Sequence, residues 1–340
     1  MAFSVTSETL LAGGRAGPVY RLAGPDGSPS AEVWTGHGFN CLRWRAGDPA
    51  RPDELLYAAP EWADDPAPTR SGVPVLFPFP NRIRDGRFHF GGRAYALPPN
   101  DPAGRNAIHG FAPRHPWRVL DAGAGPDAAW VTGVFQPSVD APEVLGLWPG
   151  DYALAITCRL SRSELVFQAR VENPGPGPLP FGLGFHPYLR PPGLAPGADV
   201  SRCRLQAAVA EEWELAASLP TGARSRTGAV RDLNAGVLLG GRGFDHLFHA
   251  APPGKAAGGM RRLGALAGPG AAGALELWAS GEFRELVVFT PPHRQAVALE
   301  PYTCATDALH LGAKGIDAGW QFLEPGRAWE ARVELRLRRE

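Results

Sequence analysis

The chain has 340 residues, of which 44% are hydrophobic, and it carries 34 basic and 34 acidic side chains. A chain of this length can bury a substantial core, either in two domains or in one large all-β unit. Neutralising a nucleic-acid backbone requires a surplus of basic residues, so zero formal net charge argues against a general nucleic-acid binder. A small neutral ligand, such as a sugar, is compatible with it.

The four cysteines, Cys41, Cys158, Cys203 and Cys304, are scattered and form no CxxC pair. Their spacing indicates neither a zinc site nor a disulfide framework, which favours a reducing compartment. The N-terminus lacks the basic segment of a secretion signal, Glu8 interrupts its first apolar stretch, and no apolar run is long enough to span a bilayer. We therefore expect a cytoplasmic protein with no membrane partner.

The first segment that invites a functional interpretation is an apolar, proline-rich run, Gly72–Ile83, which ends in Asn81-Arg82. A guanidinium at the edge of such a run carries five donors in a planar fork, which suits the binding of hydroxyls or of a carboxylate. The alternative for Arg82 is a structural salt bridge that holds a loop.

A polar loop, Pro98–Asn106, precedes Ile108-His109-Gly110-Phe111. The glycine after His109 permits close backbone approach or unusual dihedral angles. His109 is either a functional imidazole or a structural or surface histidine, and the local sequence leaves both open.

A hairpin is predicted in the middle of the chain. Alternate residues from Tyr152 to Leu160, and again from Leu165 to Val171, are apolar, and Ser161-Arg162-Ser163 joins the two runs. This alternation is typical of half-buried strands joined by a short turn, so we expect an antiparallel pair.

His186 lies among aromatic residues and glycines in the segment Phe181–Leu189. Burial there would lower the pKa of the imidazole, whereas a nearby carboxylate would raise it towards neutrality, where the ring can give and take a proton. A buried histidine that hydrogen-bonds a main-chain carbonyl is the alternative.

Regular structure is harder to predict between residues 190 and 275. Pro191–Gly197 and Gly264–Gly273 are rich in Gly, Pro and Ala and are expected to be loops, and Ala207–Ala217 is the best helix candidate of a chain with few. Asp245, in Gly243–Phe248, either binds a substrate or caps a turn.

Two later segments, Leu286–Phe289 and Ala296–Leu299, are continuously apolar, which favours strands that are covered on both faces. Glu300 ends the second segment. An ionised carboxylate at such a position is costly unless it is paired or hydrogen-bonded. We therefore expect Glu300 to belong to a functional site; a structural ion pair is the alternative.

The last predicted strand contains the alternating Val333, Leu335 and Leu337, after a turn at Pro325-Gly326. No internal repeat is evident and no change in composition marks a domain boundary. The sequence predicts an all-β protein, one large antiparallel β-sandwich, with residues 1–340 forming a single domain.

Together these residues supply a carboxylate base, two imidazoles, a guanidinium and a second carboxylate, a set that suits proton transfer on a polar, neutral substrate. The sequence has no glycine-rich phosphate loop, GxSxG nucleophile motif or HExxH metal motif. No cofactor and no metal are expected.

Five motifs, in order, resemble those of the aldose 1-epimerase (galactose mutarotase) family: GVPVLFPFPNRI, HGF, GFHPYL, FDHLF and ALEPYTCATDALHL, between about Gly72 and Leu311. The resemblance implies a galactose mutarotase-like β-sandwich whose open face holds a monosaccharide. It also implies that Glu300 is the general base and that His186 is the general acid.

The resemblance assigns Arg82, His109 and Asp245 to the binding of sugar hydroxyls. Asp245 is the weakest of these assignments because its motif is short. We expect Glu300 and His186 to face each other across a cleft, with Arg82 and His109 on its wall, in a protein taken as a monomer by default.

Three other functions remain open. A hexose-6-phosphate epimerase of the same fold would need several cations around a phosphate, for which Arg84, Arg114 and His115 are candidates. A non-catalytic carbohydrate-binding protein would keep the fold and bind the sugar without converting it. A zinc hydrolase would need ligand spacing that the nine histidines do not show.

Overall fold

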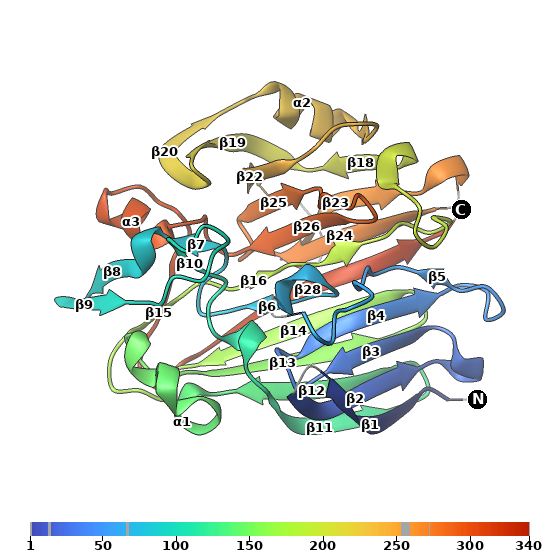
Figure 1. Cartoon of the computed structure of the whole chain (residues 1–340), viewed down its shortest axis with the longest axis horizontal. Coiled ribbons are helices and arrows are strands. Elements are labelled where there is room, and N and C mark those ends of the chain that lie inside the picture. The colour runs from blue at the N-terminus through green and yellow to red at the C-terminus, as the bar shows by residue number, and fades with distance from the viewer. Residues whose placement is uncertain (1, 13–14, 66–67, 253–258, 272, 340) are drawn as a thin grey trace.

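The structure, a computed structural model, describes residues 2–12, 15–65, 68–252, 259–271 and 273–339 (Figure 1). The structure is mostly β, and its strands pair almost entirely in antiparallel fashion. Among the described residues, no helix is long and apolar enough to cross a membrane.

The largest sheet has nine strands in the order β11-β12-β13-β14-β28-β24-β23-β18-β21. Their bounds are β11 Arg118–Ala124, β12 Ala129–Phe135, β13 Ala153–Leu160, β14 Glu164–Glu172, β18 Arg204–Ala207, β21 Val237–Leu238, β23 Met260–Ala267, β24 Ala274–Ser280 and β28 Ala328–Arg338.

The second sheet has eight strands in the order β20-β19-β22-β25-β26-β16-β6, and β17 also pairs with β26. Their bounds are β6 Val75–Leu76, β16 Gly184–Phe185, β17 Tyr188–Leu189, β19 Val209–Ala216, β20 Leu219–Ser225, β22 Asp245–Ala250, β25 Glu285–Phe289 and β26 Val297–Tyr302.

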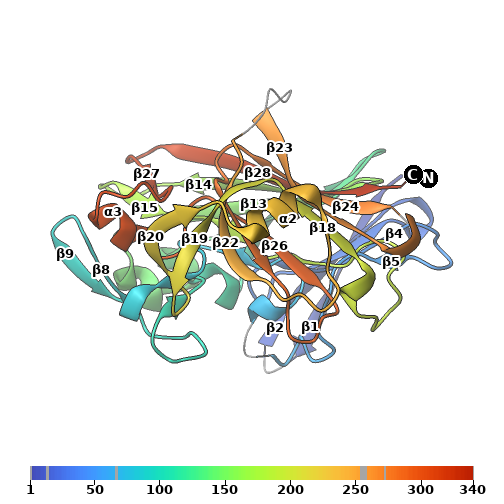
Figure 2. The same ribbon diagram turned by 90° about the horizontal axis from the view of Figure 1, so that it is seen from above.

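A third sheet, of five strands in chain order, extends the second. Its strands are β1 Ser4–Ala12, β2 Arg15–Ala23, β3 Ser30–Trp34, β4 Asn40–Ala46 and β5 Asp53–Glu54. Isolated bridges from Cys41 to Val73 and from Leu56 to Leu189 join the two sheets. The combined layer packs against the nine-stranded sheet and forms a sandwich (Figures 1 and 2).

Smaller elements surround the sandwich. The paired strands are β7 Arg82–Ile83 with β10 Ala107–Ile108, β8 Arg87–Phe90 with β9 Arg93–Ala96, and β15 Leu179–Phe181 with β27 Gln321–Leu323. The α-helices are α1 Pro137–Asp140, α2 Gly228–Ala235 and α3 Ala308–Ala313.

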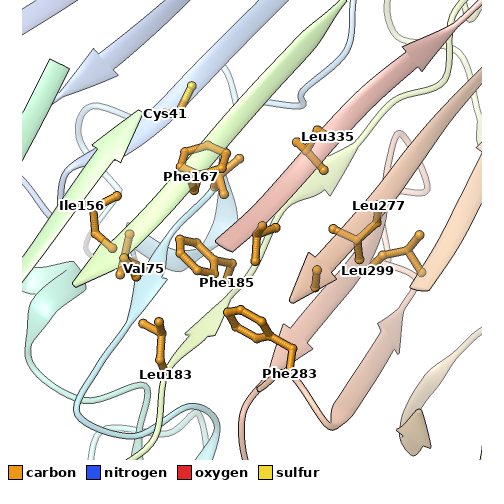
Figure 3. Close-up of a cluster of buried hydrophobic side chains, with 14 of the residues drawn as sticks. Cys41, Val75, Ile156, Phe167, Leu183, Phe185, Leu277, Phe283, Leu299 and Leu335 are labelled. Carbon is orange, nitrogen blue, oxygen red and sulfur yellow. The ribbon is translucent and has the colours of Figure 1, made fainter. Parts of the chain in front are cut away.

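The main core lies between the two layers (Figure 3). Phe167 of β14 contributes from the nine-stranded sheet and Phe185 of β16 from the eight-stranded sheet, with ring centroids 5.6 Å apart. Because successive residues of a strand point to opposite faces, each residue next to a core residue of β16 or β26 is directed to the other face of the sheet. That face carries the candidate site.

The structure confirms the predicted hairpin and C-terminal strand. β13 and β14 pair antiparallel with Leu160 opposite Leu165, and the apolar residues of both strands are buried. β28 lies between β14 and β24. β25 and β26 are buried along almost their entire length, as the continuous apolar runs predicted.

Two local predictions were wrong. The segment Ala207–Ala217 is not a helix but largely strand β19, which pairs with β20 and β22 and buries Trp213, so tertiary pairing overrides the helix-favouring composition. The segment Gly264–Gly273 was predicted to be a loop, but its start belongs to strand β23. A Cβ built on Gly264 would lie 2.9 Å from the Gln206 carbonyl oxygen and 3.1 Å from the Leu299 side chain. The glycine there permits close packing.

Truncation of Phe167 to alanine should test the sandwich core. Phe167 is 1% exposed, so Phe167→Ala removes a large apolar side chain from between the layers. We expect a loss of about 3–5 kcal/mol in the free energy of unfolding, measured by denaturant titration. Gln168→Ala, on the exposed face of the same strand, is the control and should change stability by about 0.5 kcal/mol or less. Equal effects of the two substitutions would contradict the assigned layers.

Candidate active site

Glu300 lies on the face of β26 that points away from the main core. Its neighbour Leu299 is fully buried in that core, whereas Glu300 is covered by the segments on the opposite face and is only 2% exposed. Strand pairing places it beside Val287 of β25. The carboxylate is therefore held on a rigid strand and is almost completely removed from water.

His186 reaches the same place from the end of β16. Phe185 enters the core, and the main-chain N–H of His186 donates to the Pro74 carbonyl at 3.0 Å. The imidazole stacks on Tyr188, with ring centroids 4.7 Å apart and planes at 11°. Its Nε2 lies 3.3 Å from Oε1 of Glu300, so the two groups are in direct contact.

The second carboxylate oxygen of Glu300 is also occupied. The Tyr302 hydroxyl donates a hydrogen bond to Oε2. Glu300 thus has a different partner on each oxygen, Tyr302 on one and His186 on the other. Both partners fix the orientation of the carboxylate.

Burial dominates the electrostatics of this pair. Desolvation raises the pKa of Glu300 well above its ordinary value, an effect that the Tyr302 hydrogen bond opposes and the Asp245 charge reinforces. Desolvation lowers the pKa of His186 to about 3. Burial therefore disfavours the charged form of both groups, and it favours the proton on Glu300 over the proton on His186.

His109 faces Asn81 across the ends of β7 and β10. Both residues have positive φ, 66° and 54°, and the His109 N–H donates to the Asn81 carbonyl at 2.9 Å. The Asn81 N–H in turn donates to His109 Nδ1 at 3.3 Å, which leaves Nε2 as the donor of the neutral ring. Burial, then the nearby His186 and Arg114, keep the pKa of His109 well below its ordinary value.

Gly110 makes this arrangement possible. Its φ is 67°, and a Cβ on it would come within 2.1 Å of the Phe77 carbonyl oxygen. The glycine after His109 thus allows the close approach of chains that its place in the sequence suggested.

Arg82 is fixed by two neighbours. Its Nη1 donates to the Asn81 side-chain carbonyl at 3.0 Å, and its Nε lies 3.7 Å from Asp101. Asp101 is itself buried and accepts from Arg105 and Asn106 of the same loop. The loop Pro98–Asn106 therefore positions the guanidinium.

A cavity of about 440 Å³ lies beside this group; Glu300 contacts His186 of its wall but does not itself line it. Arg82, His109 and His186 are on its wall, and Tyr188, Phe289 and Pro291 supply an apolar side. The remaining lining residues are Tyr57, Ala59, Glu61, Asp65, Thr69, Arg70, Asn100, Asp101, Pro102, Ile108, Arg114, Pro292 and His293. A concave site with an apolar wall and a few convergent polar groups suits a small polar ligand.

Asp245 lies at the edge of this arrangement. It is exposed and pairs with Phe289, one of the cavity residues, and its charge acts on Glu300. Asp245 itself does not line the cavity. The structure thus brings Glu300, His186, His109 and Arg82 together. Asp245 lies farther out, where its charge still contributes to the raised pKa of Glu300.

The candidate phosphate cations do not converge. Arg114 lines the cavity, but Arg84 pairs with Asp307 at 3.1 Å and His115 with Glu143 at 3.2 Å, and neither lines it. Within the described ranges, no group of three or more His, Cys, Asp or Glu side chains is arranged to hold a metal ion.

Sequence reasoning missed three residues that shape the site. Tyr188 and Tyr302 were noted only as letters of the HPY and EPY motifs, and Asp101 only as part of a polar loop. An aromatic residue two positions from a buried ionisable group on a strand shares its face, and this periodicity could have indicated both tyrosines. Asp101 gave no comparable signal, because its contact with Arg82 depends on the path of the loop.

The family was identified by comparison with known proteins. The sequence model of the aldose 1-epimerase family matches residues 34–336. The chain belongs to this family.

Two solved structures show the same fold. A galactose mutarotase-like protein from Clostridium acetobutylicum is 23% identical, with a TM-score of 0.87 over 100% of this chain and 99% of that one. The galactose 1-epimerase from Lactobacillus acidophilus is 15% identical, with a TM-score of 0.74 over 99% and 98%.

Relatives by sequence match over shorter stretches. The Escherichia coli protein YihR is 30% identical over 115 residues, 34% of this chain and 35% of YihR. The E. coli protein YphB is 28% identical over 138 residues, 41% of each chain. The matched segments thus span about two fifths or less of these relatives.

Glu300→Gln should stabilise the folded protein at neutral and alkaline pH. The pKa of Glu300 is raised on folding, so the native state binds an extra proton between the unfolded and folded pKa values, and stability falls as pH rises through that interval. Glutamine does not titrate, and its amide can accept from Tyr302 and donate to His186. The melting temperature of the variant should exceed that of the wild type at pH 8, and the difference should shrink towards pH 5.

Thermal unfolding across that pH range measures this effect. Glu8→Gln, at an exposed position of β1, is the control and should leave the pH dependence unchanged. A Glu300→Gln protein that melts below the wild type at every pH would show that the carboxylate is stabilising.

Proposed function

We propose that the protein is an aldose 1-epimerase, which interconverts the α and β anomers of a free aldohexose by general acid–base catalysis in a single domain. The observation that carries this proposal is the contact between the buried Glu300 and His186 beside a cavity with Arg82 and His109 on its wall. Membership of the aldose 1-epimerase family supports it.

The chemistry of anomer exchange requires two proton transfers. One proton leaves the anomeric hydroxyl and another reaches the ring oxygen, after which the ring opens. Glu300 is the proposed base for the hydroxyl and His186 the proposed acid for the ring oxygen. Rotation about the C1–C2 bond and reclosure from the other face reverse both transfers and regenerate the starting protonation states.

Three residues are proposed to bind the sugar hydroxyls: Arg82, His109 and Asp245. The guanidinium and the neutral imidazole offer donors from the cavity wall, and the Asp245 carboxylate offers acceptors from the edge. Tyr188 and Phe289 form an apolar surface that suits the C–H face of a pyranose ring.

A free sugar is favoured over a sugar phosphate by the placement of the cations. Recognition of a phosphate uses several converging Arg or Lys side chains. Of the three candidates for that role only Arg114 lines the cavity, since Arg84 and His115 pair with Asp307 and Glu143. Two further arginines line it, but each is paired with an aspartate of the same wall, Arg70 with Asp65 and Arg82 with Asp101. Initial rates with glucose, galactose and glucose 6-phosphate test this preference.

Mutarotation of freshly dissolved α-sugar tests the activity itself. Polarimetry or anomeric NMR should show a rate above the spontaneous background that is proportional to protein concentration. If the protein binds sugar and adds nothing to the background rate, it is a carbohydrate-binding protein.

Replacement of either proton-transfer residue should abolish most of this activity. Glu300→Gln and His186→Asn should each lower kcat by at least about 10²-fold, the usual contribution of a positioned acid or base. Both proteins should keep the wild-type circular dichroism spectrum. Near-normal turnover by Glu300→Gln would remove Glu300 from the mechanism.

Replacement of a hydroxyl-binding residue should weaken sugar binding and lower the rate. Arg82→Gln and His109→Gln each remove hydrogen bonds worth about 1–2 kcal/mol, which corresponds to about 5–30-fold in affinity. Calorimetric titration and KM measure this loss. Arg170→Gln, on the exposed face of β14, is the matched control and should bind as the wild type does.

A further inference from the structure

Tyr302 lies behind the candidate base and is fully buried. Its side chain packs in a small apolar cluster on the site face of the eight-stranded sheet, with Leu76, Trp213, Leu247 and Val287. It does not line the cavity. Its hydroxyl nevertheless donates to Oε2 of Glu300.

The backbone forces this contact. Tyr302 and Glu300 are two residues apart on one strand and therefore share a face. Gly184 of β16 lies directly opposite Tyr302, and a Cβ at that position would come within 2.5 Å of the tyrosine ring. The absence of a side chain at Gly184 leaves the space in which the ring lies against the sheet.

Tyr188, the second tyrosine near Glu300, hydrogen-bonds a different group. Tyr188 stacks on His186, but its hydroxyl donates to the Thr69 carbonyl at 2.9 Å. The two tyrosines therefore differ in role, because Tyr188 contacts the imidazole through its ring and Tyr302 contacts the carboxylate through its hydroxyl.

We propose that Tyr302 is a positioning residue for Glu300, in that its hydroxyl holds one carboxylate oxygen and favours the ionised form while the other oxygen faces His186. This proposal rests on the proposed function for its kinetic test. A hydrogen bond donated to a carboxylate stabilises the charged form, which here opposes the desolvation of Glu300.

Tyr302→Phe removes the hydroxyl and keeps the ring. The fraction of Glu300 that is ionised should then fall at a given pH, so the acidic limb of the kcat/KM profile should move to higher pH. A hydrogen bond to a charged group corresponds to a shift of about 1–2 pH units. On that limb kcat/KM should fall about 10–100-fold, and KM should change little because Tyr302 does not line the cavity.

Tyr152→Phe is the matched control. Tyr152 is also fully buried, but it lies in the main core, and no described residue hydrogen-bonds its hydroxyl. Removal of this hydroxyl should leave the pH profile unchanged. An equal shift in both variants would show that the effect is a general loosening and would overturn the proposal.

A second measurement is independent of any sugar. Infrared spectra of the wild type, corrected by those of Glu300→Gln, isolate the protonated carboxyl band of Glu300 and follow its titration. The midpoint should move to higher pH in Tyr302→Phe and stay in place in Tyr152→Phe. If the midpoint does not move, Tyr302 does not act on the ionisation of Glu300, whatever the activity of the protein.

The two measurements separate the two proposals. A wild-type protein without mutarotase activity contradicts the proposed function, and the infrared titration still decides the role of Tyr302. An active wild type whose acidic limb is unchanged in a folded Tyr302→Phe protein contradicts the role of Tyr302 alone. Gly184→Ala, which displaces the ring and retains the hydroxyl, should shift the titration in the same direction and provides a second variant.

Discussion

The burial of Glu300 on a strand that is covered on both faces determines which groups must surround its carboxylate. A carboxylate removed from water is stable only with hydrogen-bond donors or a proton, and the structure places the Tyr302 hydroxyl against one of its oxygens and the His186 imidazole against the other. The opposite side of β26 contributes Leu299 to the main core. Core packing thus fixes the position of the carboxylate, and the same desolvation raises the pKa of Glu300 and lowers that of His186, which reverses their ordinary order of proton affinity.

The site has a rigid part and a part that depends on loops. Glu300 and His186 are attached to neighbouring strands of the eight-stranded sheet, whose inner faces are packed against the nine-stranded sheet. Arg82 and His109 come from the short β7–β10 pair, where Asn81 and His109 adopt positive φ and hydrogen-bond each other. Loops tolerate sequence change better than packed strands, so under the proposed function the loop-borne part, with Arg82 and His109, is where the sugar accepted would be adjusted.

Sequence pattern predicted those features that depend on local periodicity. The β13–β14 hairpin, the last strand and the buried character of β25 and β26 follow from alternating or continuous apolar residues, and the position of Glu300 at the end of such a run indicated its unusual environment. The strand β19 was missed because Ala, Glu and Leu favour a helix, whereas the structure pairs this segment with β20 and β22. Helix α2 was missed although Thr227 caps its start and Gly236 its end, both recognisable signals. The contacts of Arg82 with Asp101 and of Glu300 with His186 join distant parts of the chain, so only the fold reveals them.

The direct contact between His186 and Glu300 has a consequence for sugar affinity. His186 Nε2 and Glu300 Oε1 lie 3.3 Å apart, and under the proposed function the anomeric and ring oxygens of a sugar would enter between them. On the proposed mechanism a sugar must separate the two groups before either can act on it, and the free energy of that separation is subtracted from the binding of both anomers alike. The proposed proton-transfer pair is thus an intramolecular competitor of the proposed ligand. We expect a site of this kind to bind the sugar less tightly and to release either product more rapidly.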